Sequence, residues 1–212
     1  MVDQISWIIF SIPSLLIAST VHEFAHAWTA YKLGDLTAKL RGRLTLNPLA
    51  HIDLVGGLMM ILTRFGWSKP VPINEQNFKN PIIGTAITSA AGSISNITMA
   101  FMASMAFRIM NGPEILVQEN MDLKYLIAYF LLVFISLNLS LGIFNLIPLP
   151  PLDGHKIVRA FLPKNLRYYW ESFEKYGTWV LILIFIPFSP LNYVVNFILS
   201  TAISILAGIF LG

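Results

Sequence analysis

The chain has 212 residues, of which 56% are hydrophobic and only 12% are charged, and its formal net charge at pH 7 is +3. Soluble domains carry about 25% charged residues, so this composition excludes an ordinary soluble domain and favours a membrane protein. The small positive charge does not indicate nucleic-acid binding, because the basic residues of a membrane protein usually lie in its cytoplasmic loops.

Five apolar stretches predict an α-helical polytopic membrane protein with about five transmembrane helices. These stretches cover residues 5–31, 82–110, 125–147, 178–188 and 191–211. A helix needs roughly 20 apolar residues to cross a bilayer, so four of the stretches are long enough. The fourth stretch crosses only if it also includes residues 169–176.

The first apolar stretch contains the segment VHEFAHAW, which places two histidines and a carboxylate in an otherwise apolar run. Because His22 and His26 are four residues apart, a helix brings them to one face, about 6 Å apart along its axis. Two imidazoles at this spacing can share one metal ion, and Glu23 can polarise a metal-bound water, as in the H-E-x-x-H motif of zinc hydrolases. Coincidence is the alternative, but this composition yields the motif by chance only roughly 0.002 times per chain, and ionisable residues inside a span are costly.

The segment between the first two apolar stretches is more than a simple loop. Apolar and polar residues alternate over residues 36–46, which predicts a β-like strand or hairpin. Residues 51–67 are apolar but interrupted by glycine, which favours a short re-entrant or interfacial element. The prolines of residues 67–74 predict an extended stretch.

A catalytic zinc ion needs a third protein ligand beyond two histidines. Since the chain has no cysteine, the candidates are His51, His155 and the acidic residues. Asp153 follows the third apolar stretch and a proline-rich turn, in NLIPLPPLDGHKI, which can place it at the membrane edge near the depth of the two motif histidines. The alternative is that Asp153 caps the following helix or forms a turn with Gly154.

Three motifs together, VHEFAHAW, AGSISN and NLIPLPPLDGHKI, resemble those of the site-2 protease family of intramembrane zinc metalloproteases, and the resemblance covers most of the chain. It implies one zinc ion per chain, whose ligands are His22, His26 and Asp153. It also makes Glu23 the catalytic base and places Asn96 near the active site. An alternative role for Asn96 is a polar contact between helices.

The resemblance further implies a minimal form without an accessory domain. We expect a single domain over residues 1–212, with a catalytic core at about residues 5–158 and a C-terminal helical pair at about residues 170–211. The roles of two histidines stay open. His155 stands where the family often has glycine, and it either supports the site, titrates with pH or is an ordinary cytoplasmic residue. His51 either lines the site or belongs to a turn.

The expected activity is the cleavage of transmembrane helices in single-span membrane proteins, as in regulated intramembrane proteolysis. Glu23 would accept the proton of a zinc-activated water, and Asn96 would hydrogen-bond the developing oxyanion or position the substrate. The substrate helix must unwind locally, because its amides are hydrogen-bonded within the helix. Residues 36–46 could then receive the unwound chain by strand addition. The expected partners are this substrate and the lipid bilayer, not nucleic acid.

Two other functions remain possible from the residues alone. A metal transporter or metal-binding scaffold in the membrane would also place His and Asp in helices, but it would not need Glu23 beside the first ligand. Another membrane zinc protease, which cuts soluble or lipidated tails, would share the first motif, but its site is commonly completed by a glutamate of a later helix. The third ligand distinguishes this second alternative from a site completed by Asp153.

The basic residues predict the orientation of the chain in the membrane. Twelve of the fourteen Lys and Arg residues fall in two segments, which lie between the first and second and between the third and fourth apolar stretches. These residues are Lys32, Lys39, Arg41, Arg43, Arg64, Lys69, Lys79, Lys156, Arg159, Lys164, Arg167 and Lys175. By the positive-inside rule both segments are cytoplasmic, so we expect the N-terminus outside, the C-terminus inside and the site toward the cytoplasm.

Overall fold

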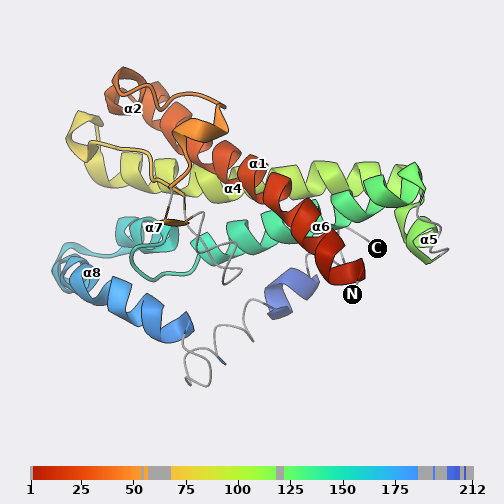
Figure 1. Ribbon diagram of the computed structural model, residues 1–212. Coiled ribbons are helices and arrows are strands. Elements are labelled where there is room, and N and C mark those ends of the chain that lie inside the picture. Colours follow the sequence, from red (N-terminus) through yellow and green to blue (C-terminus); the bar gives the residue numbers. More distant parts are fainter. Residues whose placement is uncertain are drawn as a thin grey trace.

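The computed structural model describes residues 2–53, 55–56, 68–117, 122–185, 193, 200–205 and 208, and it is mostly helical (Figure 1). Its elements in chain order are α1 (Val2–Lys32), α2 (Thr37–Leu40), η1 (Pro48–Ala50), η2 (Glu75–Asn77), α4 (Pro81–Ile109), α5 (Gly112–Val117), α6 (Leu123–Asn145), α7 (Asp153–Phe161) and α8 (Lys164–Phe185). The elements η1 and η2 are short 3₁₀ helices.

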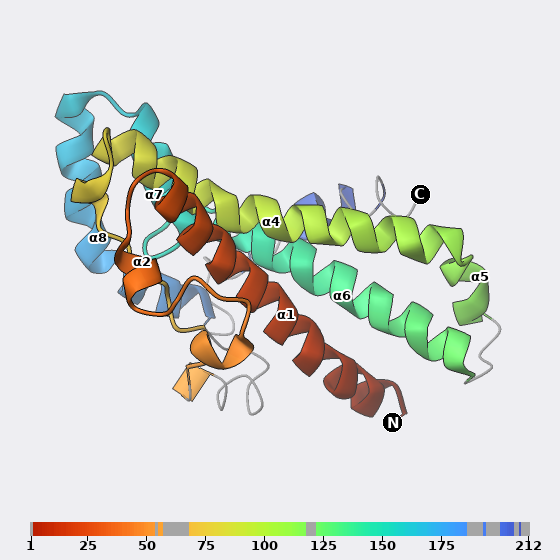
Figure 2. The same cartoon turned by 90° about the horizontal axis from the view of Figure 1, so that it is seen from above.

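The long helices α1, α4 and α6 pack against one another, and the N-terminal half of α1 diverges from α4 (Figures 1 and 2). Two of them begin at capping side chains. Asn80 accepts a hydrogen bond from the Ile83 N–H at the start of α4, and Asp122 accepts one from the Tyr125 N–H at the start of α6. Small buried residues on α4 allow the close helix approach that is typical of membrane proteins. These include Gly84, Ser89, Gly92, Ser93, Ala100 and Ala103.

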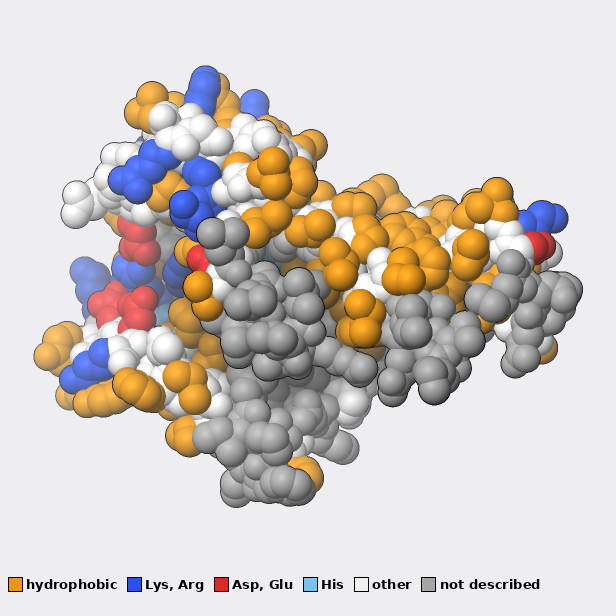
Figure 3. Space-filling view, in the orientation of Figure 1, with side chains coloured by type: hydrophobic (Ala, Val, Ile, Leu, Met, Phe, Trp, Pro, Cys, Tyr) orange, Lys and Arg blue, Asp and Glu red, His pale blue; other side chains and the backbone are white. Residues whose placement is uncertain are grey.

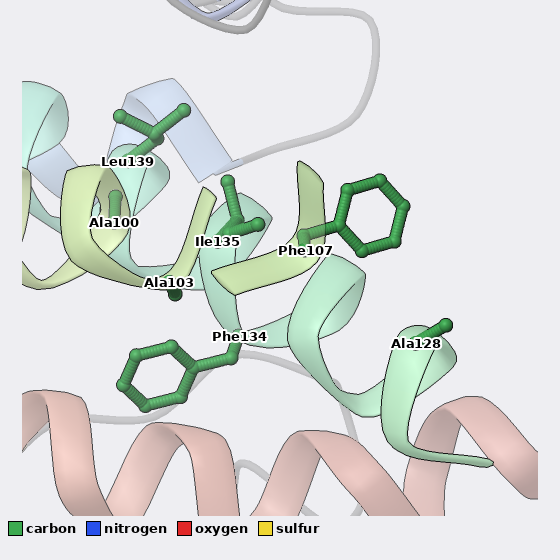
Figure 4. Packing of buried hydrophobic residues seen from close by; sticks show 7 residues of the cluster. All are labelled: Ala100, Ala103, Phe107, Ala128, Phe134, Ile135 and Leu139. Carbon is green, nitrogen blue, oxygen red and sulfur yellow. The ribbon is translucent and has the colours of Figure 1, made fainter. Parts of the chain in front are cut away.

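A cluster of buried apolar side chains joins α4 to α6 (Figure 4). Its members are Ala100, Ala103, Phe107, Ala128, Phe134, Ile135 and Leu139. The cluster ends at two fully buried amides, because Asn96 lies one turn before Ala100 and Asn138 directly precedes Leu139. The apolar half of the bundle therefore leads into a polar layer between the same helices.

Three of the described helices are long and apolar enough to cross a membrane: Trp7–Lys32, Pro81–Ile109 and Leu123–Asn145. Figure 3 agrees with this assignment, since apolar side chains cover the middle of the visible face and charged side chains gather toward its ends. The prediction of a helical membrane protein is confirmed, and these spans match the first three apolar stretches. The fourth stretch overlaps α8, whose described residues are not among the candidate spans, and the fifth lies mostly outside the described residues. The total of about five spans stays a prediction.

The predicted β-like segment at residues 36–46 is wrong. The chain forms the single helical turn α2 there, followed by bends. The Asp35 carboxylate starts this turn by accepting hydrogen bonds from the N–H and hydroxyl of Thr37, and Gly42, at a φ of +67°, lets the backbone reverse. In the described part of the chain the only β-bridge pairs Ile52 with Ser68. The predicted re-entrant element at residues 51–67 lies mostly outside the described residues.

The turn between α6 and α7 brings the third sequence motif onto the bundle. Leu149 and Leu152 of this turn pack against Ile184 of α8 in a second apolar cluster. A Cβ atom at Gly154 would collide with the carbonyl oxygens of Leu146 and Ile147. Only glycine allows this close approach, which presses the first turn of α7, with Asp153, against the end of α6.

Candidate metal centre and active site

Two histidines of α1 and one aspartate of α7 converge in the bundle. The Nε2 atoms of His22 and His26 lie 3.2 and 3.1 Å from one carboxylate oxygen of Asp153, and the potential ligand atoms of the three residues lie within 4.8 Å of one another. The imidazole rings are nearly perpendicular, with an interplanar angle of 88°. At most 9% of each residue is exposed. The i, i+4 spacing therefore presents both imidazoles to the carboxylate of Asp153, which lies 131 positions after His22.

The outer nitrogen of each imidazole has its own hydrogen-bond partner. The Nδ1 atom of His22 lies 2.6 Å from Oδ1 of Asn96, and that of His26 lies 2.7 Å from the Thr88 carbonyl oxygen. A carbonyl or amide oxygen only accepts, so each Nδ1 carries the proton and donates. In its neutral form, an imidazole held this way keeps a lone pair on Nε2, the atom that faces Asp153. Such contacts are what fix a histidine as a metal ligand.

Asn96 is fully buried and uses its amide entirely within the protein. Its Oδ1 accepts from His22, while its Nδ2 donates to the Ala18 carbonyl at 3.1 Å and to Oδ1 of Asn138 at 2.9 Å. Asn138 in turn donates to the Phe134 carbonyl at 2.9 Å. With both N–H groups of Asn96 engaged, this geometry favours orientation of His22 over the oxyanion contact that the sequence suggested. Sequence reasoning missed Asn138, although an amide inside an apolar stretch is a usable signal.

Gly92 explains another part of the second motif. A Cβ atom at this position would lie 2.5 Å from Cε1 of His26 and 2.7 Å from Cε1 of His22. Because a side chain would displace both rings, α4 needs glycine where it faces them.

The donor chemistry of the three residues fits a divalent metal such as zinc. Asp153 is buried against the two imidazoles and offers a carboxylate oxygen as the third ligand atom. Two neutral imidazole nitrogens and one carboxylate oxygen, brought this close together, form the three-ligand set of catalytic zinc sites.

Glu23 lies beside the first histidine but contacts a different segment. Its Oε1 accepts a hydrogen bond from the Ser68 hydroxyl, and its Oε2 accepts one from the Val71 N–H, both at 2.8 Å. It is 6% exposed. Sequence reasoning predicted the extended stretch that contains Ser68 and Val71 but not its contact with Glu23.

The other two histidines do not join this group. The Nε2 atom of His51 lies 2.8 Å from the Thr45 carbonyl oxygen, within the loop that follows α2. His155 stacks on Trp170 with a ring-centroid distance of 4.9 Å, and Trp170 donates through Nε1 to the His155 carbonyl. His155 thus joins α7 to α8, which is a structural role.

Comparison with known proteins places the chain in a family. The sequence pattern described as "Peptidase family M50" matches residues 58–187. The Bacillus subtilis protein named "Putative zinc metalloprotease YwhC" is 40% identical over 175 residues, which cover 82% of this chain and 78% of that protein. "Putative zinc metalloprotease Rip2" of Mycobacterium tuberculosis H37Rv is 26% identical over 177 residues, which cover 81% of this chain and 64% of that protein.

No solved structure matches the chain significantly. The family pattern includes Asn96 and Asp153 and begins after the helix that carries the two histidines. The matched region covers more than half of the chain. This match and the similarity to YwhC agree with the family resemblance of the three sequence motifs. The chain therefore belongs to peptidase family M50, the site-2 protease family, and is a protease.

Proposed function

We propose that this protease is an intramembrane zinc endopeptidase, which cuts transmembrane helices of other membrane proteins, as in regulated intramembrane proteolysis. The observation that carries the proposal is the convergence of His22, His26 and Asp153, with Glu23 directly after the first histidine in the sequence. Because both histidines and Glu23 belong to the candidate span Trp7–Lys32, the reaction would occur at the depth of a membrane helix. The names of the similar bacterial proteins support zinc as the metal.

In this mechanism the Nε2 atoms of His22 and His26 and a carboxylate oxygen of Asp153 would hold the zinc ion. When bound, zinc supplies Lewis acidity, which makes water a better nucleophile at neutral pH and polarises a carbonyl group. Glu23 accepts a proton from the attacking water as the water oxygen bonds to the peptide carbonyl carbon. The same carboxyl then gives the proton to the leaving nitrogen as the C–N bond breaks. Asn96 keeps the His22 ring oriented throughout.

The proposed substrate is a single-span membrane protein. Its helix must unwind locally before cleavage, because helical amides are engaged in hydrogen bonds to the preceding turn. The lipid bilayer is the second partner. Water would enter from the cytoplasmic side, in line with the orientation that the basic residues favour.

Substitution of Glu23 by Gln tests the mechanism. The change preserves size and leaves the three proposed zinc ligands in place, but it removes the ability to accept a proton. We expect zinc content and folding to persist while cleavage of a reconstituted single-span substrate falls by about two orders of magnitude or more, the usual effect of losing a general base. Zinc analysis and a gel-based cleavage assay measure the two quantities.

The matched control is Glu114→Gln, which alters an exposed carboxylate on α5 and should leave cleavage unchanged. Undiminished cleavage by the zinc-loaded Glu23→Gln protein would rule out the proposed mechanism. A metal transporter would give another result: the unmodified protein would cut no membrane protein in the purified system, and Glu23→Gln would alter metal flux.

A further inference from the structure

Residues 68–75 form an extended strap that ends in the first residue of η2 and crosses between α2 and α7 in the view of Figure 1. The strap supplies both donors to the Glu23 carboxylate, one from the Ser68 hydroxyl to Oε1 and one from the Val71 N–H to Oε2, each at 2.8 Å. We propose that the strap, anchored by Arg43, positions the carboxylate of Glu23 for proton transfer. This inference rests on the catalytic role proposed for Glu23.

Prolines on both sides restrict the donor at the centre of the strap. Pro70 and Pro72 have no N–H and fix their own φ angles, so Val71 provides the only backbone donor of these three residues. The Val71 side chain is 8% exposed and packs with Ala27 and Ala38. The direction of the Val71 N–H is therefore held both by the stiff backbone and by side-chain packing.

Arg43 anchors the strap between its two donors. The guanidinium group donates from Nη2 to the carbonyl of Lys69 at 2.6 Å, and Lys69 itself lies between Ser68 and Val71. The Lys69 N–H donates to the His51 carbonyl at 2.9 Å, and Ser68 bridges to Ile52. The loop that contains Arg43 and His51 thus holds the N-terminal end of the strap.

The burial of Arg43 indicates that this contact is important. The residue is only 8% exposed, and its Nε has no hydrogen-bond partner among the described residues. Burying a charged group with an unsatisfied donor is unfavourable. A smaller, neutral side chain could donate one hydrogen bond to a carbonyl at lower cost. The guanidinium of Arg43 contacts the Lys69 carbonyl, which lies between Ser68 and Val71, the two donors to Glu23.

The other end of the strap is tied to the third ligand's helix. The Asn74 N–H donates to the Asp35 carboxylate at 2.8 Å, and Glu75 pairs with Arg159 of α7 at 2.9 Å. Since α7 begins with Asp153, the segment that holds the base is fixed to the helix that carries a proposed zinc ligand. Base and metal site therefore keep a constant relative position.

This arrangement leaves the base chemically competent. Each carboxylate oxygen has two acceptor positions, and the strap fills one on each, so one on each oxygen stays available for a water proton. A general base must lie within about 2.6–3.2 Å of the proton donor. The two donors restrict rotation of the Glu23 side chain, which would otherwise move the carboxylate away from the water.

The test compares Val71→Pro with Val71→Ala in the purified full-length protein loaded with zinc. Val71→Pro removes the N–H but suits an extended backbone, whereas Val71→Ala keeps the N–H and removes only packing. We expect kcat for a single-span substrate to be about tenfold or more lower in Val71→Pro than in Val71→Ala, the scale of one hydrogen bond to a charged group. KM and zinc content should agree within about twofold between the two variants.

Arg43 and Ser68 give a second arm that leaves the strap backbone unchanged. Arg43→Gln should lower kcat more than KM, and Arg43→Lys, which keeps a charged donor for the Lys69 carbonyl, should restore part of the loss. Ser68→Ala should lower kcat several-fold, and Ser68→Thr, which keeps the hydroxyl, should restore it. If Val71→Pro fails to fold or to bind zinc, these variants decide.

The proposal is overturned if Val71→Pro matches Val71→Ala in kcat, or if loss of either donor raises kcat, since the strap would then restrain the base instead of positioning it. Unchanged kcat in both Ser68→Ala and Arg43→Gln also overturns it. The Glu23→Gln protein separates the two levels of inference. If that variant is inactive while the strap variants are normal, only the strap proposal fails; if it cleaves normally, the proposed mechanism fails first.

Discussion

At the scale of single residues, the site depends on Asp153 more than on any other group. His22 and His26 are brought together by the geometry of one helix, whereas Asp153 is the only member of the set that comes from another element. Its carboxylate faces both Nε2 atoms at 3.1–3.2 Å. Without it, the histidines form a two-ligand site, which is one protein ligand short of a catalytic zinc site.

We expect Asp153→Ala to lower zinc affinity by at least about tenfold, since even partners of metal ligands contribute that much, and to abolish cleavage. Metal analysis after dialysis against a weak chelator measures the first effect. Glu174→Ala, which alters an exposed carboxylate of α8, controls for the loss of a negative charge. If Asp153→Ala kept full zinc content and full activity, the third-ligand assignment would be wrong.

At the scale of elements, the junction of α6 and α7 sets the position of Asp153. Gly154 follows it directly, and its backbone lies against the Leu146 and Ile147 carbonyls with no room for a Cβ atom. The neighbouring atoms are backbone atoms at the end of a long helix, so they cannot move aside as a flexible side chain can. Any larger residue must displace α7.

Gly154→Ala should therefore destabilise the protein by about 1–3 kcal/mol, the usual scale of overpacking, and reduce zinc content by moving Asp153. Thermal unfolding in detergent and metal analysis test the two effects. Gly208→Ala is the matched control, because a Cβ atom there meets nothing within 4 Å. A Gly154→Ala protein with unchanged unfolding temperature and unchanged zinc content would contradict the packing argument.

At the scale of the whole molecule, three candidate spans hold the proposed metal site within the bundle. The charged side chains visible in Figure 3 gather toward the ends of the molecule. The strap and α7 lie at the end of the bundle where α1 finishes and α4 begins (Figures 1 and 2). The positive-inside rule predicts that this end faces the cytoplasm, and labelling experiments can test that orientation.

Single cysteines at Lys69 and Lys164 should resist an impermeant thiol reagent in intact cells and react after lysis. Because the natural chain has no cysteine, any label on this chain comes from the introduced residue. Glu114→Cys, in the segment between the second and third spans, should be labelled from outside in the same cells. Labelling of the Lys69 and Lys164 positions from outside would invert the proposed topology.

The sequence by itself determined the membrane class and the local part of the site. The spacing of His22 and His26 is sufficient to place them on one helix face, because helix periodicity is a property of the backbone. Asp153 was predictable as a candidate third ligand, from its place after an apolar stretch and from the family resemblance of its motif. Long apolar runs likewise identify membrane helices without knowledge of their neighbours.

Only the tertiary structure decided how these groups are supported. The Asn96 contact spans 74 positions to His22, and the Val71 contact spans 48 positions to Glu23, so neither follows from local spacing. The strand expected at residues 36–46 failed for the same reason: alternation describes which residues avoid water, but a strand needs a partner to satisfy its backbone. Here the Asp35 carboxylate accepts a hydrogen bond from the Thr37 N–H, and the backbone forms a helical turn instead. Local periodicity can be read from neighbouring residues in the sequence, whereas hydrogen-bond partners depend on which distant segments pack together.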